Sequence, residues 1–455
     1  MTAAPDTDKT DNVDPQHDYV LRAVEERGVK LIRLWFTDVL GQLKSVAISP
    51  AELDTALEEG LHFDGSAIDG FSRIQESDVL AMPDPSTFEL LPWADGGSTA
   101  RMFCNIFNPD GLPFEGDPRH VLRRNLMKAQ DEGYAFFVAP EMEFFYFADG
   151  EPGSAPKLLD SGSYFDLTTS DVASDLRRET LSVLETMGIP VEYSFHEDSP
   201  SQHEIDLRYT DALTMADQIM TFRLIVRELA LERGRYASFM PKPLAGMQGS
   251  GMHLHLSLFG ADDNAFHTED MEYSLSETGR MFTAGLLHHA REITAVTNQL
   301  VNSYKRLVVG YEAPVWVSWA QNNRSALVRV PVTRPDKTSS TRIEFRSPDP
   351  ACNPYLAFSV ILAAGLKGIK EGYELPPETT KNLFETTPSE ARKMGIDPLP
   401  ASLAEALDEM EKSELVHDAL GDHIFEWFLR NKRSEWRDYK AHVSSWELER
   451  YLPSW

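Results

Sequence analysis

Three segments of the chain place titratable side chains two residues apart within otherwise apolar runs. Side chains alternate between the two faces of a β-strand, so residues two apart project from the same face. The residues are Glu141 and Glu143, His253 and His255, and Arg342, Glu344 and Arg346. One such strand alone is explained by a solvated sheet face. Three of them favour a shared pocket, because buried carboxylates and imidazoles need charged or hydrogen-bonding partners.

A further acidic cluster lies in the segment from His196 to Glu204, which includes Glu197, Asp198 and His203. Together with the glutamates above, it supplies several carboxylates and a histidine to one site. Oxygen-rich ligand sets of this kind suit Mg²⁺ or Mn²⁺, whereas zinc usually has more histidine or cysteine ligands. The sequence therefore indicates a site for hard divalent cations.

Several arginines accompany these acids in the second half of the chain. They are Arg306, Arg324, Arg329, Arg342 and Arg346. Guanidinium groups bind carboxylates and phosphates, and they stabilise a phosphoryl group during its transfer. Divalent cations combined with arginines are the equipment of phosphoryl transfer, so this pattern predicts an anionic substrate.

Three loops are less specific when each is taken alone. The glycine-rich segment 242–251 matches no nucleotide-binding loop motif, and a tight turn explains it equally well. The acidic segment 64–71, with Asp78 shortly after it, reads as a solvated loop. The segment 302–314 is either an ordinary surface connection or a mobile loop that carries Glu312 over a site.

The elements that must position these residues follow from periodicity and turn signals. A hairpin is expected at 30–36 and 43–48. Further strands are expected near 135–147, 191–195, 203–209, 252–258, 326–332 and 342–345. Helices are expected from 117 onwards, at 170–187, 212–233, 276–299 and 354–370, and from 401 to the end. We predict a disordered tail at 1–16, a small domain at 17–110 and a large domain at 111–455, because the segment 107–116 is rich in proline, glycine and aspartate.

Composition excludes several classes of protein. The 455 residues include 72 acidic and 43 basic side chains, a formal charge of −29, and 42% of them are hydrophobic. Such a chain can bury a large core. Its charge argues against nucleic acid and against an anionic membrane as partners. The two cysteines, Cys104 and Cys352, are far apart, which argues against a disulfide scaffold or a zinc–thiolate site. The polar first residues and the lack of a long apolar run predict a soluble, cytoplasmic protein.

Taken in order, these segments resemble type I glutamine synthetases from about Tyr19 to Trp455. The segments that carry the resemblance are FDGSAIDGF, PEMEFF, HEDSPSQHEIDLRY, FMPKPLAGMQGSGMHLHLSLF, NSYKRLVVGYEAPV, NRSALVRVP and RIEFRSPDPACNPYLAF. The resemblance implies an α+β fold. A small N-terminal β-grasp domain would precede a glutamine synthetase-type α/β catalytic domain whose antiparallel strands line a funnel.

The resemblance also implies ligand sets for two or more Mg²⁺ or Mn²⁺ ions and for ATP. One metal would be held by Glu143, Glu197 and Glu204, and the other by Glu141, His253 and Glu344. ATP, the co-substrate, would lie near Glu192, Tyr209, His255, Ser257 and Arg342. Glutamate would be bound by Gly249, Arg306 and Arg346.

In the family, ATP phosphorylates the γ-carboxylate of glutamate, and ammonia then displaces phosphate to give glutamine. Arg324 and Arg329 would stabilise the phosphoryl group, and Glu312 would close the site. Asp64, which comes from a neighbouring subunit in the family, would deprotonate ammonium. The amine pocket would consist of Asp64, Ala67, Asp78, Tyr164 and Glu197. Phe384 stands where adenylylated relatives carry a tyrosine, so that control should be absent.

Three departures concern the amine acceptor. Ammonia-using relatives usually have a second serine where this chain has Ala67, an asparagine at Gln248 and often a proline at Val309. The family also contains γ-glutamylpolyamine and γ-glutamylalkylamine synthetases, which change only the amine pocket. An organic amine is therefore an alternative acceptor to ammonia.

Family members assemble as two stacked hexameric rings with shared active sites, which implies a homododecamer. The C-terminal helix, near 444–451 here, would bind the opposite ring. A catalytically silent ring-forming relative is a second hypothesis, but silent relatives lose metal or arginine residues that this chain keeps. A guanidino-kinase-type phosphotransferase is a third, and it would release no free phosphate.

Overall fold

The chain divides into two units by its internal contacts. The computed structural model describes residues 15–70, 78–93, 98–167, 173–261, 263–333 and 337–455. The smaller unit comprises the described parts of 1–36, 44–65 and 77–114, and the larger unit comprises those of 37–43, 66–76 and 115–455. The predicted disordered tail lies almost wholly outside the described residues, although residues 15 and 16 already belong to a helix.

A mixed sheet forms most of the smaller unit. Its strands lie in the order β2 (Leu43–Ile48), β1 (Leu31–Thr37), β6 (Thr99–Phe107), β4 (Asp78–Pro83) and β3 (Leu61–Asp64), and β5 (Glu89–Leu90) also pairs with β6. The β1–β6 pair is parallel, whereas β3, β4 and β5 pair in antiparallel fashion. Helices α1 (Pro15–Glu26) and α2 (Leu53–Glu59) complete the unit. Trp35 and Phe103 pack edge to face in its core, with ring centroids 5.6 Å apart.

The larger unit is built on a sheet of ten strands. The main order is β14 (Trp319–Ala320), β15 (Val328–Arg329), β16 (Ile343–Phe345), β13 (Met252–Phe259), β7 (Ala135–Asp149), β10 (Gln202–Leu207) and β9 (Val191–His196). Three short strands, β8 (Lys157–Leu158), β11 (Thr210–Asp211) and β12 (Tyr236–Ser238), also pair with β7. The pairs between β16, β13, β7, β10 and β9 are all antiparallel. The long strand β7 is therefore the centre that connects the predicted chemical strands.

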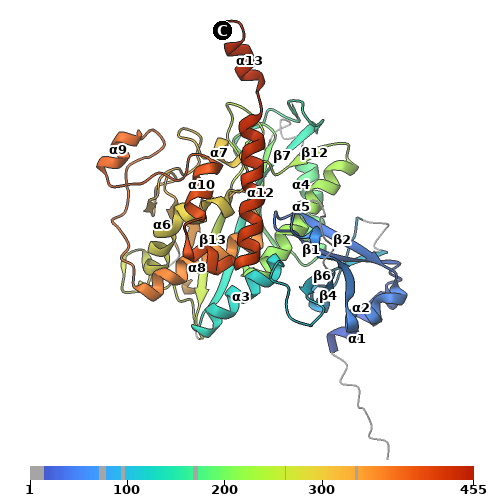
Figure 1. Cartoon of the computed structure of the whole chain (residues 1–455). Helices are drawn as coiled ribbons and strands as arrows, with labels where there is room; N and C mark the ends of the chain where they lie inside the picture. The colour runs from blue at the N-terminus through green and yellow to red at the C-terminus, as the bar shows by residue number, and fades with distance from the viewer. Residues whose placement is uncertain (1–14, 71–77, 94–97, 168–172, 262, 334–336) are drawn as a thin grey trace, which may run out of the picture. The chain divides into compact units, whose positions relative to one another are not determined.

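The larger unit also contains the following helices, several of which pack on this sheet (Figure 1). They are α3 (Pro118–Asp131), α4 (Ser174–Thr186), α5 (Ala212–Glu232), α6 (Glu277–Thr297), α7 (Ser303–Arg306), α8 (Pro354–Glu371), α9 (Pro388–Lys393), α10 (Leu403–Met410), α11 (Glu414–Leu420), α12 (Asp422–Ala441) and α13 (Ser445–Tyr451). Helix α8 shows why these segments are helical. Asn353 accepts hydrogen bonds from the first backbone amides, Pro354 occupies the first turn, and Gly372 ends the helix with a left-handed φ of 66°.

A buried ion pair joins three of these helices. Arg119 of α3 donates to Asp217 of α5 at 2.9 Å, and Tyr355 of α8 donates to the same carboxylate at 2.6 Å. Both charged side chains are almost fully buried. Removing one partner of such a pair leaves an uncompensated buried charge, so these contacts fix the mutual placement of α3, α5 and α8.

Helix α13 differs from the others because none of its residues is buried. It projects beyond the rest of the larger unit at the C-terminal end (Figure 1). Its apolar side chains, Trp446, Leu448 and Tyr451, are all exposed. Its start is well defined by a capping box between Ser444 and Glu447.

Most predicted elements agree with the structure to within a few residues, and one prediction is clearly too long. The strand expected at 326–332 is confined to Val328 and Arg329. Ala326 donates back to Asn323 in a turn, and Pro331 has no amide hydrogen for a ladder. Among the residues that the structure describes, no helix is long and apolar enough to cross a membrane.

Candidate active site

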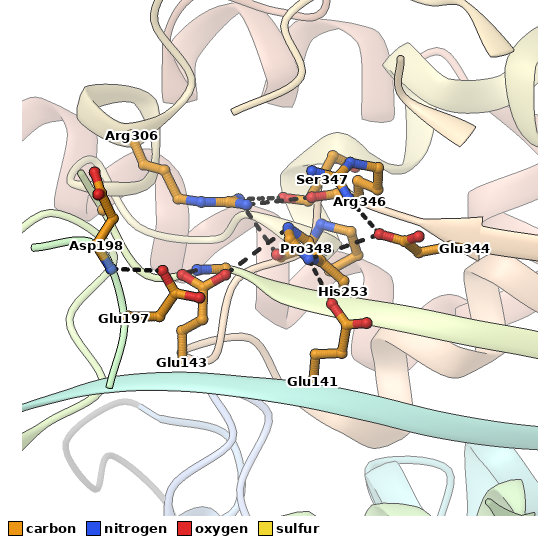
Figure 2. A network of polar contacts seen from close by, with 12 residues as sticks. Glu141, Glu143, Glu197, Asp198, His253, Arg306, Glu344, Arg346, Ser347 and Pro348 are labelled. Carbon is orange, nitrogen blue, oxygen red and sulfur yellow. Dashed lines mark hydrogen bonds and ion pairs between the residues drawn. The ribbon is translucent and has the colours of Figure 1, made fainter. Parts of the chain in front are cut away.

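The predicted alternation brings the chemical residues of β7 and β13 together. Glu141 and His253 are register partners, and their Oε2 and Nδ1 atoms lie 2.8 Å apart. The Nε2 atom of His255 lies 2.7 Å from Oε1 of Glu141. One glutamate therefore contacts both histidines of the neighbouring strand, and Figure 2 shows His253 directed at its carboxylate.

Glu344 of β16 completes this cluster from the other side of β13. Its fully buried side chain pairs with Arg346 and, at 2.7 Å, with Nη1 of Arg329. Its Oε1 lies 3.8 Å from Nδ1 of His253. One potential ligand atom each of Glu141, His253 and Glu344 lies within 4.8 Å of the others, so these three side chains could hold a metal ion.

The other predicted metal ligands lie in the same pocket but are less tightly gathered. Glu143 accepts hydrogen bonds from the Gly251 amide at 2.9 Å and from Gln202 at 3.1 Å. Glu204 is the register partner of Glu143, and the Glu197 carboxylate accepts a hydrogen bond from the backbone amide of Asp198. The second ligand-like group that the described residues form here consists of Glu141, Glu204 and Asp206. The structure thus places Glu204 beside Glu141 and Asp206 as well as beside Glu143 and Glu197.

The carboxylates differ in their charge balance. Burial, reinforced by Glu197, raises the pKa of Glu143 to about 8. Burial and neighbouring acids also raise the pKa of Glu204 well above its usual value. For Glu141, burial acts in the same direction, but hydrogen bonds from His253 and His255 outweigh it and hold the pKa well below the usual range.

The raised pKa values of the buried glutamates indicate whether divalent cations fit the site. Carboxylates that are buried together resist ionisation unless a positive charge offsets their repulsion and desolvation. Glu143 and Glu204 lie in that situation, and their oxygen donors are the kind that Mg²⁺ and Mn²⁺ prefer. The residues present therefore fit a hard divalent cation.

The pocket has a volume of about 280 Å³ and is lined by the larger unit. Residues of every predicted class except the ATP set line it. They include Glu141, Glu143, Tyr164, Glu197, Glu204, Gly249, His253, Arg306, Glu312, Arg324, Arg329 and Arg346. Of the described lining residues, none comes from the predicted ATP set.

The arginines predicted at glutamate differ in what they contact. Buried Arg306 donates to the backbone carbonyls of Ser347 and Arg346 at 2.7 and 3.2 Å (Figure 2). The Nε atom of Arg346 is buried without a hydrogen-bond partner. A side chain on Gly249 would lie 2.4 Å from the Pro241 carbonyl oxygen, so this position requires glycine. Arg346 therefore keeps a donor for a ligand, whereas Arg306 also braces the backbone beside it.

The predicted closing loop carries Glu312 in an unusual backbone conformation. Its φ is +43°, in the left-handed region, and Gly310 nearby has a φ of +94°. Non-glycine residues in this region are strained and cluster at functional sites. Lys242 Nζ lies 3.8 Å from the ring centroid of Tyr311, directly before Glu312. A cation–π contact thus connects this loop to the segment that carries Gly249.

The residues predicted to surround ATP lie on the strands beside the pocket or directly next to their ends. Arg342 Nε donates to His255 Nδ1 at 3.1 Å, and His255 in turn contacts Glu141, so Arg342 is connected to Glu141 through His255. Ser257 is the register partner of Phe137, whose ring packs 6.0 Å from that of exposed Tyr209. Glu192 lies exposed on β9.

The predicted amine-pocket residues are divided between the two units. Asp64 and Asp78 face each other as register partners of β3 and β4 in the smaller unit. Ala67 follows in a short turn that belongs to the larger unit, as do Tyr164 and Glu197. Only Tyr164 and Glu197 of this set line the pocket described above.

Sequence reasoning missed several lining residues, above all Asp206. Burial, followed by the charge of Glu141, raises the pKa of Asp206 to about 7. Asp206 is two residues after Glu204 in β10, so the alternation rule that selected the other strands would have found it. Gln202, Phe195, Tyr311 and Phe384 also line the pocket. No comparable sequence signal marks the two phenylalanines.

Comparisons with known proteins agree with this geometry. Residues 28–109 match the family model "Glutamine synthetase, beta-Grasp domain", and residues 115–451 match "Glutamine synthetase, catalytic domain". Proteins named glutamine synthetase from Mycobacterium tuberculosis strain H37Rv and Methanosarcina mazei are 57% and 51% identical. The first alignment covers 97% of this chain and 100% of the relative, and the second covers 95% and 97%.

A solved structure described as "GmaS/ADP complex-Conformation 1" is also similar, with a TM-score of 0.86 and 32% identity. The match covers 95% of this chain and 99% of that one. The family models confirm the predicted order of a β-grasp domain followed by a catalytic domain.

Proposed function

Because the chain belongs to the glutamine synthetase family, we propose that it ligates ammonia to the γ-carboxyl group of L-glutamate, with ATP as the source of the phosphoryl group. The observation that carries this proposal is the cluster of Glu141, His253 and Glu344, in which Glu344 pairs with Arg329 and Arg346. Nucleotide phosphates and glutamate are anions, and such a site is built to receive them.

The metal ions would be held on two sides of the pocket. Glu141, His253 and Glu344 would bind one, and Glu143, Glu197 and Glu204 the other, with Asp206 near both sets. When bound, divalent cations neutralise phosphate oxygens and hold the nucleotide in place. The raised pKa values of Glu143 and Glu204 support cation binding, because ionised ligands are stabilised only when positive charge is present.

The ligation takes two steps. A γ-carboxylate oxygen of glutamate attacks the γ-phosphorus of ATP, and ADP leaves with the electrons of the broken P–O bond. Ammonia then attacks the carbonyl carbon of γ-glutamyl phosphate, phosphate leaves, and one proton is removed from nitrogen. Arg324 and Arg329 would stabilise the phosphoryl group, and Arg346 and Gly249 would hold glutamate.

Water must be kept from the acyl phosphate, which it would hydrolyse. Glu312 would close the site and accept the proton from the attacking nitrogen. Its strained backbone supports this role, because such strain persists where a loop is held for function. Asp64, from the small domain of a neighbouring copy, would remove the proton of ammonium.

Shared active sites require assembly, and we propose a double-ring dodecamer in the cytoplasm. Helix α13 supports this, because none of its residues is buried and its tryptophan, leucine and tyrosine side chains are exposed. A helix that exposes large apolar side chains is stabilised when a second copy covers them. Sedimentation of the full chain tests the assembly, and a variant that ends at Ser444 should give smaller particles.

The decisive experiment measures phosphate release with Mg²⁺, ATP and glutamate, and compares ammonium with putrescine, spermidine and a monoalkylamine. Products are identified by mass spectrometry. We expect the fastest release with ammonium, and glutamine as the product. A clear preference for an organic amine would show that Ala67 has changed the acceptor, and no release with any amine would overturn ligase activity.

A further inference from the structure

A second cluster of two histidines and a carboxylate lies outside the lining of the pocket. It consists of Asp160, between β8 and α4, His196 at the end of β9, and His203 in β10. All three side chains are fully buried, and their potential ligand atoms lie within 4.8 Å of one another. By distance alone the cluster could hold a metal ion.

The arrangement of protons argues against that reading. Nδ1 of His203 lies 2.8 Å from Nη1 of Arg177. A guanidinium group only donates, so this Nδ1 accepts, and the proton of the neutral ring is on Nε2. A protonated Nε2 cannot bind a metal, and it faces Oδ2 of Asp160 at 3.8 Å. The cluster therefore keeps too few ligands for a metal and works as a hydrogen-bond network.

Asp160 is the centre of this network. Its Oδ1 accepts from the Ser201 amide at 2.7 Å and from the Gly162 amide at 3.1 Å, and it lies 3.0 Å from His196 Nε2. In return, the Ser201 hydroxyl accepts from the Leu159 and Asp160 amides at 2.7 and 3.2 Å. Two distant chain segments, 159–162 and 196–201, are thus tied together in both directions.

The fit between these segments is close. A side chain on Gly162 would lie 2.4 Å from His196 Nε2, so only glycine lets the imidazole ring approach. Ser201 has a left-handed φ of +67°, which the two-way contact with Asp160 maintains. His196 also donates from Nδ1 to the carbonyl of Glu197 at 2.7 Å.

Each histidine of the network directly precedes a proposed metal ligand. Glu197 follows His196, and Glu204 follows His203. The Phe165 amide donates to the His196 carbonyl at 3.0 Å, which also ties in the segment that carries Tyr164. We propose that Asp160 is a positioning residue that sets the placement of Glu197 and Glu204, and with it the affinity of their cation site. This inference rests on the proposed function, which makes these glutamates metal ligands.

The test is Asp160→Asn in the full chain, titrated with Mn²⁺ alone and followed by electron paramagnetic resonance. The asparagine side chain removes the negative charge beside His196. Its amide nitrogen would take the place of Oδ2 and face the protonated Nε2 of His203, so two donors would oppose each other. We expect one class of Mn²⁺ site to weaken about tenfold, the usual size of such effects on metal affinity. The site of Glu141, His253 and Glu344 should keep its affinity.

Asp217→Asn is the matched control, because it removes the charge of another almost fully buried carboxylate, the one bound by Arg119 and Tyr355. It should lower the thermal unfolding midpoint and leave both Mn²⁺ affinities unchanged. If Asp160→Asn fails to fold, Ser201→Ala removes two hydrogen bonds of the same network and should weaken the same site by less.

The outcomes separate this inference from the function on which it rests. Wild-type protein that binds no Mn²⁺ would overturn the proposed metal site itself. Wild-type protein that binds Mn²⁺ while Asp160→Asn or, failing that, Ser201→Ala binds with the same two affinities would overturn only the positioning role. A rise in the KM for Mg²⁺ with kcat little changed would support that role independently.

Discussion

The two sides of the pocket carry similar glutamates in opposite electrostatic states. On the first side, which we call the compensated side, Glu141 and Glu344 contact His253, His255, Arg329 or Arg346, and the pKa of each glutamate lies below its usual value. On the second, the acidic side, Glu143, Glu197 and Glu204 have raised pKa values because burial dominates. Figure 2 shows Glu143 and Glu197 on one side of His253 and Glu344 on the other.

This difference shows which half of the site has its charges balanced by protein side chains alone. The compensated side has its charge balance built in, so its geometry is set by ion pairs and hydrogen bonds. The acidic side reaches the same balance only with bound cations. Variants should therefore damage the compensated side through unpaired charges, and the acidic side through cation affinity.

We expect Glu344→Gln, on the compensated side, to have the largest effect on activity and stability. It leaves the buried guanidinium group of Arg346 and the partly exposed one of Arg329 without their carboxylate. We expect activity to fall about 10³-fold, as for a transition-state contact, and stability to fall by about 3 kcal/mol, as for other broken buried pairs. Steady-state kinetics and thermal unfolding measure the two effects. Glu371→Gln, in an exposed pair with Lys367, is the control and should change neither.

Glu312→Ala should lower kcat about 10²-fold, the lower end for a lost general base. The residue belongs to a loop rather than to either side, so the KM values for ATP and glutamate should stay within about twofold. Product analysis should show more phosphate released per glutamine, because the acyl phosphate is less protected. Unchanged turnover in this variant would remove Glu312 from the mechanism.

The pH dependence of stability should distinguish the two sides without mutation. Glu143 has a pKa of about 8 in the folded chain and an ordinary one near 4.5 when unfolded. The folded state therefore holds a proton that the unfolded state has lost, and this stabilisation disappears as the pH rises through 8. Between pH 6 and 8, Glu141 is ionised in both states and adds no slope.

Glu143 alone should accordingly cost the metal-free protein about 2 kcal/mol over that interval, from one proton over about two pH units. Asp206 and Glu204, whose pKa values are also raised, act in the same direction. Denaturant unfolding in a chelator, repeated with saturating Mg²⁺, measures the difference. Bound cation should flatten or reverse the slope. If the free energy of unfolding of the metal-free protein instead rises between pH 6 and 8, Glu143 is not protonated in the folded state as we expect.

Lys242→Met should have the smallest effect, because it removes the cation–π contact with Tyr311 and one hydrogen bond from Nζ to the backbone carbonyl of Met247. Such contacts contribute about 0.5–1 kcal/mol at exposed sites, so kcat should fall by about two- to fivefold. Tyr311→Phe keeps a ring under the ammonium group and should retain more of the activity. Equal losses in both variants would mean that the contact does not hold the loop.

The sequence predicted the compensated side better than the acidic one, for a physical reason. Alternation along β7, β13 and β16 fixes which side chains share a face, and strand pairing then places Glu141 opposite His253. The turn from Glu197 to Gln202 follows no such period. It is held by contacts with a distant segment, such as the hydrogen bond from the Ser201 amide to Asp160, and no sequence period reveals such contacts.

Arg306 shows a second limit of sequence reasoning. Charge and position predict a substrate-binding arginine, but its hydrogen bonds to backbone carbonyls depend on how the segment 346–348 folds back. The shortened strand at Val328 had a local signal in Pro331, whereas no local signal marks Phe384 as a pocket residue.

The exposure of helix α13 also provides an optical reporter. Trp446 is 57% exposed and the terminal Trp455 is 98% exposed, whereas Trp35, Trp316 and Trp319 are buried. Indole emission shifts to shorter wavelength when water is excluded from the ring. If α13 packs against a second copy as proposed, dilution should shift the fluorescence to the red as subunits separate, and Trp446→Phe with Trp455→Phe should remove most of that shift.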